Sequence, residues 1–579
     1  MKRVFGILLV MVLMVGCGDQ EDLERYITCH NNGTVTGFTG YSETDADLEQ
    51  LTEMPEFESL GLNFNANITD TRLVHLKELP NLMRLNLGEN SPSALLTQSA
   101  VWSSVINHQS RVLKSPLVRT VDLDIGETVT AELSNRKSVT IRLLHLEEVR
   151  DPIRQAVRSA KVTIEVDSRT VTIESGMYNL PMRVGNVQIE CPVTSGYNSN
   201  GTPAFWGLDK AARLRVWPAE SPLTRPGSLI YPVEQRWFAT RTWFDNEAVD
   251  GGSKILPKIY YHSGLDIGAS EAQVKVIAAT DALVISVANR VLEGHRKDTP
   301  VAARYDVVYL LDQRGWYYRY SHLHKINDKL RPGKFIVKGA EIGTVGKEGA
   351  SGGWSHLHFE IKSRQPSGKW GTQAGYAFLW EAYRNQFNPV IVANARRKNF
   401  LLAGEAATLD GSKSWSATDS IQSYEWTFSD GSTSTGSTVT RTYPKPGFYS
   451  EILKVTDDAG RVDYDFAEVH VVSPKAPDRY APGIHAVYWP TFGNRVNQPI
   501  TFKVRSFREP FGEEVWDFDD GSPKVRVKSD GNIDPHANDG YAVTQHTYRE
   551  PGDYLVQVQR KTKSGQTATT RLHVHVAAQ

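Results

Sequence analysis

Two histidines, His356 and His358, stand two residues apart in the run GGWSHLHFEI, and imidazoles are common ligands of metal ions. In a β-strand, alternate side chains point to the same face, so the two rings would lie side by side. The same spacing recurs near the C-terminus, where RLHVHVAAQ contains His573 and His575. The spacing alone therefore does not distinguish a metal site from a sheet with imidazoles on its exposed face.

The middle of the chain adds further candidate ligands to the first pair. The run YYHSGLDIG supplies His262 and Asp266, and YRYSHLHKI supplies His322 and His324. A catalytic zinc ion needs three protein ligands of nitrogen or oxygen type and an open position for water. Two histidines and an aspartate meet that need, and Gly264 lets the chain turn tightly between the first two candidates. This region therefore predicts a hydrolytic metal site.

The order of these motifs resembles the lysostaphin/LytM-type zinc metallopeptidases, whose β-sheet core carries His-x-x-x-Asp, then Tyr-x-His-Leu, then His-x-His. The segments HSGLD, YSHL and HLHFE match, as does the glycine-punctuated run RPGKFIVKGAEIGTVGKEGA, over residues 235–365. The resemblance implies Zn²⁺ as the cofactor and the metal ligands His262, Asp266 and His358.

The same resemblance implies roles for other residues of the motifs. His322 and His356 would orient or deprotonate the water that attacks the peptide bond, without a covalent intermediate. His324 has no place in the family pattern and is expected to be structural. Several members use a tyrosine a few residues ahead of the first ligand to assist the oxyanion, but here Tyr260 and Tyr261 stand next to that ligand, so the sequence equates neither of them with it. The charged insertion EGHRKDTPVAARYD is expected on loops at the rim of the cleft.

The first residues, MKRVFGILLVMVLMVGCGDQ, have the layout of an export signal. Two basic residues precede an apolar run that is too short to span a bilayer comfortably. The Gly16-Cys17 pair resembles the lipobox of bacterial lipoproteins, which implies a signal over residues 1–17 and a membrane anchor through a lipidated Cys17. A signal with an incidental cysteine is the alternative. The expected location is the cell envelope, on the periplasmic or outer face of a membrane, where Cys29 and Cys191 can pair.

Length and charge bound the remaining possibilities. A chain of 579 residues is too long for one core, so several domains are expected. Its 65 Lys and Arg residues nearly balance 66 Asp and Glu residues, so the composition gives no reason to expect a nucleic-acid partner. Partners must be inferred from individual sites.

The segment before the metal motifs divides into two parts. Residues 18–110 contain two stretches that match at an offset of 25 residues and resemble leucine-rich repeats, which suggests packing or protein contact. Residues 111–230 hold alternating runs such as KSVTIRLL and AKVTIEVD, which predict antiparallel strands in a β-rich domain of unknown role. The metallopeptidase domain is assigned to residues 231–389.

The C-terminal part contains a second internal repeat. The first copy contains YEWTFSDGS and, further on, RTYPKPG. The second copy contains the matching segments VWDFDDGS and HTYREPG, and the Trp, Phe and Gly have identical spacing in both. Alternating aromatic residues and Asp-Gly turns are typical of β-sandwiches. The copies resemble PKD domains, immunoglobulin-like modules of extracellular proteins, over residues 390–476 and 477–579. His573 and His575 would lie on the closing strand of the second copy, without a third ligand, and are expected to be structural.

Together these features predict a mainly β, multidomain protein. An antiparallel β-sheet metallopeptidase core would be followed by two immunoglobulin-like β-sandwiches and preceded by a leucine-rich-repeat unit and a β-rich domain. The predicted activity is zinc-dependent hydrolysis of peptide bonds in peptidoglycan stems or cross-bridges. Two alternatives stay open: the same chemistry on protein substrates, and a non-catalytic envelope scaffold that binds proteins through its repeats and PKD-like domains.

Overall fold

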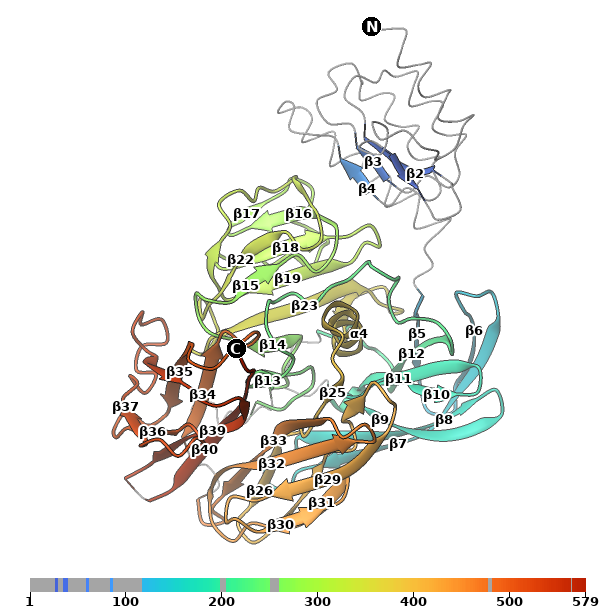
Figure 1. Ribbon diagram of the computed structural model, residues 1–579. Coiled ribbons are helices and arrows are strands. Elements are labelled where there is room, and N and C mark those ends of the chain that lie inside the picture. The colour runs from blue at the N-terminus through green and yellow to red at the C-terminus, as the bar shows by residue number, and fades with distance from the viewer. Residues whose placement is uncertain are drawn as a thin grey trace, which may run out of the picture.

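The computed structural model describes residues 117–197, 205–249, 260–476, 482–563 and 565–579, together with the backbone of four short strands nearer the N-terminus (Figure 1). The described residues are mostly in strands, and α4 (Tyr376–Phe387) is the α-helix among them. The mainly β, multidomain fold class predicted from the sequence is therefore confirmed. None of the helices in this part of the chain is long and apolar enough to cross a membrane.

The four early strands are β1 (Ile27–Cys29), β2 (Val35–Thr39), β3 (Ser59–Gly61) and β4 (Arg84–Asn86). Strands β2, β3 and β4 run parallel, and between β3 and β4 Leu60 pairs with Leu85, so partners in that ladder are 25 residues apart, whereas those between β2 and β3, such as Phe38 and Leu60, are 22 apart. Stacked repeats of that period would pair in this way. The signal, Cys17 and the rest of the predicted repeats lie outside the described residues, and the assignments to a lipoprotein signal and to leucine-rich repeats stay predictions.

The region from 117 to 218 forms an eight-stranded sheet. Its strands are β5 (Arg119–Leu123), β6 (Thr128–Glu132), β7 (Ser138–Arg150), β8 (Val157–Val166), β9 (Arg169–Ser175), β10 (Met182–Val184), β11 (Val187–Thr194) and β12 (Ala212–Pro218), with the 3₁₀ turn η2 (Ser195–Tyr197) after β11. Burial alternates along the first half of β7, so the period-two pattern read from KSVTIRLL has its apolar face in the core.

Cys191 lies in β11 as a free, buried thiol, whereas the side chain of Cys29, its predicted partner, lies outside the described residues. Burial raises the pKa of Cys191 to about 12. The thiol therefore stays protonated at neutral pH, and a protonated thiol is a poor nucleophile.

We expect Cys191 to resist iodoacetamide at pH 8 in the native protein and to react fully in denaturant without a reductant. Peptide mapping by mass spectrometry separates it from the other cysteines. Reaction that requires a reductant would show a disulfide instead, and fast labelling of the native protein would contradict the burial.

A nine-stranded sheet forms the centre of the molecule and continues into the helix. Its path is β13 (Thr242–Trp243), β14 (Leu265–Gly268), β23 (His356–Arg364), β19 (Tyr317–Ser321), β18 (Val308–Leu311), β16 (Ala282–Val287) and β17 (Arg290–Val291), with β21 (Phe335–Ile336) beside β16 and β24 (Trp370–Gln373) beside β23. A second sheet of β15 (Lys275–Ile277), β22 (Glu341–Val345) and β20 (Leu323–Ile326) shares its apolar core.

Two β-sandwiches follow the helix and share one sheet. The first has β25 (Ile391–Val392), β26 (Asn399–Leu402), β27 (Ala406–Asp410), β28 (Trp415–Ser416), β29 (Ile421–Thr427), β30 (Thr433–Thr435), β31 (Thr438–Thr442), β32 (Gly447–Asp457) and β33 (Val462–Val472). The second has β34 (Gly483–Trp489), β35 (Pro499–Phe507), β36 (Glu514–Asp517), β37 (Val525–Val527), β38 (Ala542–Thr547), β39 (Gly552–Lys561) and β40 (Thr567–Val576). Strands β32 and β40 pair through Phe448 and Ala568, which joins the two sandwiches edge to edge.

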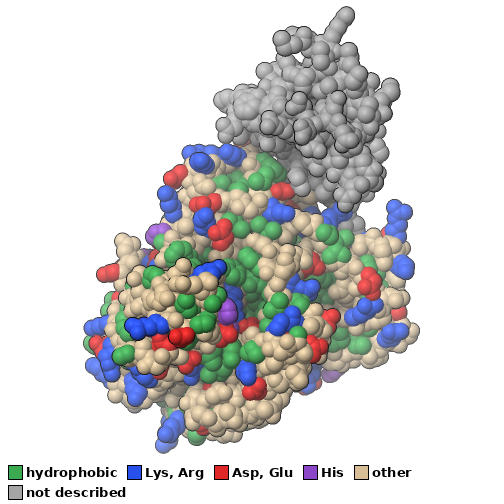
Figure 2. Space-filling model, in the orientation of Figure 1, with side chains coloured by type: hydrophobic (Ala, Val, Ile, Leu, Met, Phe, Trp, Pro, Cys, Tyr) green, Lys and Arg blue, Asp and Glu red, His purple; other side chains and the backbone are tan. Residues whose placement is uncertain are grey.

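The repeated aromatic residues of the sandwiches are core residues. Trp426 and Trp516 are fully buried in the two separate cores, as their matching positions in the repeat predict. On the molecular face shown in Figure 2, positive and negative side chains are interspersed.

Buried charges tie the first sandwich to the peptidase region. Asp463 on β33 forms an ion pair with Arg236, accepts the backbone N–H of Ala393 at 2.9 Å, and lies 3.1 Å from Nδ1 of His573. Burial alone would raise the pKa of Asp463, but the charge of Arg236 outweighs it and the pKa is lowered. The contact joins residues more than two hundred positions apart in the chain.

We expect Asp463→Asn to lower the free energy of unfolding by roughly 2–4 kcal/mol, because Arg236 would lose its partner in a largely buried place. The folded-state pKa is lowered, so the wild type should lose this advantage as the pH falls below about 4, and the variant should lack that pH dependence. Calorimetric unfolding between pH 3 and 7 measures both.

Glu425→Gln is the matched control, because the pair between Glu425 and Lys454 at 3.1 Å is on the surface of the same sandwich. Its cost should stay below about 0.5 kcal/mol. Equal effects from the two substitutions would contradict the role given to the buried pair.

Candidate metal centre

The antiparallel register of β14 and β23 brings the first candidate ligands together. Asp266 pairs directly with His358 across the two strands, and His262 precedes β14 by one tight turn. Gly264 has a φ of 78°, and a Cβ there would lie 2.8 Å from the carbonyl oxygen of Phe359, so only glycine lets the turn pass this close to β23. Ligand atoms of His262, Asp266 and His358 all lie within 4.8 Å of one another.

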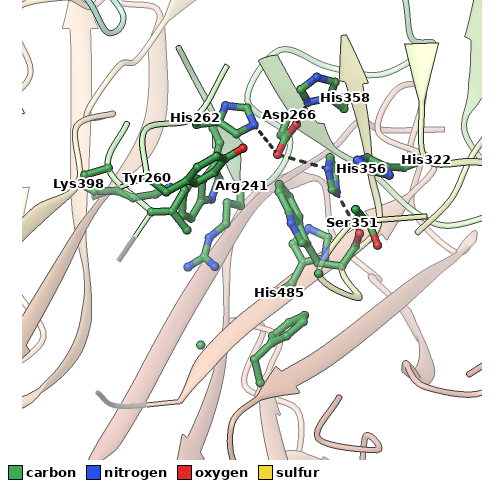
Figure 3. A pocket seen from close by; sticks show the side chains of 18 of the residues that line it. Arg241, Tyr260, His262, Asp266, His322, Ser351, His356, His358, Lys398 and His485 are labelled. Carbon is green, nitrogen blue, oxygen red and sulfur yellow. Dashed lines mark hydrogen bonds and ion pairs between the residues drawn. The ribbon is translucent and has the colours of Figure 1, made fainter. Parts of the chain in front are cut away.

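The carboxylate of Asp266 lies between the two rings (Figure 3). Its Oδ2 is 2.9 Å from Nε2 of His262, and its Oδ1 is 2.7 Å from Nδ1 of His358. All three side chains are buried. Burial alone would raise the pKa of Asp266, but the adjacent imidazoles, His262 first, hold that pKa well below its usual range. The carboxyl is therefore ionised at neutral pH, as a metal ligand must be.

These residues fit a zinc ion by the chemistry of their donors. Two imidazoles and one carboxylate are a known ligand set for catalytic zinc. His358 faces the carboxylate of Asp266 with its Nδ1, while its buried Nε2 lies 3.9 Å from Glu360 and makes no hydrogen bond with the described residues. Because Nδ1 of His262 lies 3.3 Å from the carbonyl oxygen of Phe244, its Nε2 is the nitrogen that faces the cluster.

His322 and His356 form a second pair beside this cluster, with ring centroids 4.6 Å apart. Nδ1 of His322 donates to the carbonyl of Glu348 at 2.6 Å, and Nδ1 of His356 donates to the carbonyl of Trp354 at 3.0 Å. A carbonyl only accepts, so each ring has a proton on Nδ1. That leaves Nε2 of His322 as an acceptor, and Nε2 of His356 lies 3.3 Å from Oδ2 of Asp266. Burial lowers both pKa values, that of His356 to about 3, so both rings are neutral at neutral pH.

The backbone at His322 is strained and held in place. Its φ is 65°, in the left-handed region that non-glycine residues rarely occupy. The backbone N–H donates to Oδ2 of Asp306 at 3.0 Å, and Arg304 binds the same carboxylate at 2.7 Å. Such a conformation persists only where its surroundings enforce it, and it is typical of functional sites. Asp306 belongs to the charged insertion expected at the cleft rim, and no sequence motif marks it as a partner of His322.

The five side chains open onto a cavity of about 440 Å³. Tyr260 lines it, whereas Tyr261 is buried elsewhere with its hydroxyl accepting the N–H of Val157 at 2.7 Å. Of the two tyrosines that the sequence could not separate, Tyr260 is therefore the one at the site. Both sandwiches also contribute lining residues, among them Lys398 and His485 (Figure 3). Sequence reasoning missed these, because neither belongs to a recognisable motif.

The remaining histidines of the motifs lie apart from this cavity. His324 is 41% exposed and groups with Glu271 and Glu348, but Lys347 already forms an ion pair with Glu271. His573 and His575 each lie 2.8 Å from Oδ1 of Asp553, and they form no metal-binding group with other described residues. Both arrangements agree with the structural roles expected for these histidines.

Comparison with known proteins defines the class of the central domain. A model of peptidase family M23 matches residues 260–369, and two PKD domain models match residues 387–471 and 488–576. The chain thus contains a family M23 peptidase domain, of the LytM type, followed by two PKD domains. The resemblances on which the sequence analysis rested are confirmed for these three domains. Family M23 peptidases are hydrolases and are typically metal-dependent.

Solved structures align with parts of the chain. The PKD1 domain of the Vibrio cholerae metalloprotease PrtV is 32% identical, with 14% of this chain and 95% of that chain covered and a TM-score of 0.12. The PKD1 domain of Vibrio anguillarum Epp is 28% identical, with 15% and 98% covered and a TM-score of 0.13. Helicobacter pylori Csd3 is 16% identical, with 51% of this chain and 60% of that chain covered and a TM-score of 0.18.

We expect His358→Ala to lose bound metal and His322→Ala to keep it, because only the first side chain belongs to the converging donor set. Mass-spectrometric metal analysis of both purified proteins, after loading with zinc and removal of excess, tests this directly. Loss of the metal from the His322 variant would show that the two sets of histidines are wrongly assigned.

Proposed function

We propose that this chain is a zinc endopeptidase that hydrolyses peptide bonds in the stems or cross-bridges of peptidoglycan. One observation carries the proposal: within a family M23 domain, His262, Asp266 and His358 converge beside two neutral imidazoles at a single cavity. A scaffold without catalysis would have no need of both sets, and both are complete here. That completeness favours the enzyme over the scaffold.

The metal ligands and the two other histidines would have different roles in the hydrolysis. Zinc, held by His262, Asp266 and His358, would acidify a water molecule and polarise the scissile carbonyl. His322 and His356, neutral and with Nε2 unprotonated, would accept the proton from the attacking water and return it to the leaving amine.

The hydroxyl of Tyr260 would donate a hydrogen bond to the substrate carbonyl oxygen as negative charge develops there. Burial raises the pKa of Tyr260, so the phenol keeps its proton at neutral pH. The described residues that line the cavity do not identify one peptide sequence.

The predicted location in the cell envelope supports peptidoglycan as the substrate. The predicted export signal would take the enzyme out of the cytoplasm. A lipid on Cys17, as the lipobox resemblance implies, would hold it against a membrane that faces the wall. The LytM-type domain supports the same substrate class. The repeats and the PKD domains would then contact envelope proteins.

We expect the full chain without residues 1–17 to bind zinc and to release new muropeptides from purified sacculi, and His358→Ala to do neither. Chelation should abolish release, and added zinc should restore it. Chromatography with mass spectrometry of the soluble products identifies the bond. Zinc-dependent cleavage of a protein panel without any release from sacculi would redirect the proposal to protein substrates, and the absence of both would favour the scaffold.

A further inference from the structure

The segment that leads into β23 makes few contacts with the rest of the peptidase domain: the carbonyl of Ser355 accepts the N–H of Ala269 at 3.2 Å, and the hydroxyl of Ser351 donates to the carbonyl of Lys347 at 2.5 Å. Gly352 and Gly353 both have positive φ values, and the run from Ala350 to Ser355 is a succession of turns without a strand. Such glycine-rich backbone loses much conformational freedom when it is ordered. Yet His356 follows it directly, and its ring must be placed accurately beside the donor set. Something outside the segment has to hold it.

The second PKD domain makes those contacts with four consecutive residues. The carbonyl of Gly352 accepts from the side chain of Asn532 at 3.1 Å, and the carbonyl of Gly353 accepts from Arg505 at 2.6 Å. The N–H of Ser355 donates to the hydroxyl of Tyr541 at 2.8 Å. Trp354 and His485 pack edge to face, with ring centroids 5.0 Å apart. We call residues 352–355 the clamped segment.

Trp354 passes this restraint on to His356. The two rings are stacked, with centroids 3.9 Å apart and planes inclined by 20°. The carbonyl of the same tryptophan accepts the Nδ1 proton of His356 at 3.0 Å, which selects the tautomer that the reaction requires. Displacing Trp354 would therefore disturb both the position and the tautomer of one catalytic ring.

Tyr541 connects the clamped segment to His485 on β34. Its oxygen accepts from Ser355, so its own proton is directed to the other partner that the structure gives it, Nδ1 of His485, at 2.7 Å. His485 lies 1% exposed on β34 and lines the catalytic cavity, and a Cβ at Gly268 would come within 3.0 Å of its Nε2. The fit between β34 and β14 thus depends on a glycine directly opposite His356 in the ladder.

We propose that the second PKD domain is a working part of the active site, in which Tyr541 and His485 are positioning residues that hold His356 through the clamped segment. The inference rests on the proposed function, since it assigns these residues a role in the same hydrolysis. It gives a domain usually regarded as a spacer a direct part in turnover.

The test compares two tyrosines of the same domain in the full chain without residues 1–17. Tyr541→Phe removes the hydroxyl that joins Ser355 and His485. Tyr548→Phe is the matched control, because Tyr548 is also buried in that domain and its hydroxyl donates to the carbonyl of Phe518 at 3.2 Å, away from the cavity. A misplacement of about 1 Å at a reacting group can cost roughly a hundredfold in rate.

We expect Tyr541→Phe to lower kcat by about 10- to 100-fold with KM and bound zinc unchanged, and Tyr548→Phe to keep wild-type kcat. Hydrogen–deuterium exchange of peptides covering residues 350–356 should be at least about tenfold faster in the first variant and unchanged in the second. If Tyr541→Phe fails to fold, Asn532→Asp replaces it, since aspartate tolerates the left-handed backbone there but offers Gly352 no donor.

The outcomes separate the two proposals. A wild type that binds no zinc and cleaves nothing refutes the proposed function, and the positioning role falls with it. In an active wild type, unchanged kcat in Tyr541→Phe overturns the positioning role, whether or not exchange is faster. A fall in kcat that the Tyr548 control shares, or that comes with lost zinc, overturns it too, because the effect would then be general.

Discussion

The site depends on the antiparallel pairing of β14 with β23. That ladder sets Asp266 opposite His358 and Gly268 opposite His356, so one register places a ligand pair and also opens the space beside the second catalytic ring. A shift by one residue would turn every side chain of the strand to the other face of the sheet. Strand β19 adds to the same arrangement, since Ser321 pairs with His358 and delivers His322 at the end of its strand. Three strands thus specify the relative positions of all five side chains.

Much of this could be predicted from the chain itself, and for a physical reason. Metal ligation requires particular donors at particular intervals along strands, so the requirement appears directly in short motifs such as HSGLD and HLHFE. The PKD repeat is readable in the same way, because its buried Trp and Phe recur at fixed spacing. The sequence could not show whether Tyr260 or Tyr261 faces the cavity, since adjacent residues of an extended chain point in opposite directions. The structure shows it, because the hydroxyl of Tyr261 binds the backbone N–H of Val157 and Tyr260 lines the cavity.

The contacts between domains could not be predicted from the sequence either. The ion pair of Arg236 with Asp463 and that of Arg241 with Glu468 each join residues 227 positions apart, and neither charge stands in a motif. Surface and interface charges look alike in a sequence, because both are single polar residues on otherwise ordinary strands. Only the docked arrangement shows that these groups are buried, and burial is what turns such a pair from a minor contact into one whose disruption is costly.

Docking of the sandwiches also bears on the electrostatics of the site. The neutrality of His356 arises chiefly from burial, and part of the material that buries it is Trp354, which is backed in turn by His485 of the second PKD domain. A peptidase core with that side open to water would stabilise the charged form of the ring and raise its pKa, so a larger share of the rings would already carry a second proton and could accept no other. The sandwich wall therefore helps to maintain the protonation state that hydrolysis needs, as well as the position of the ring. Geometry and acid–base chemistry at His356 thus have a common origin in one interdomain contact.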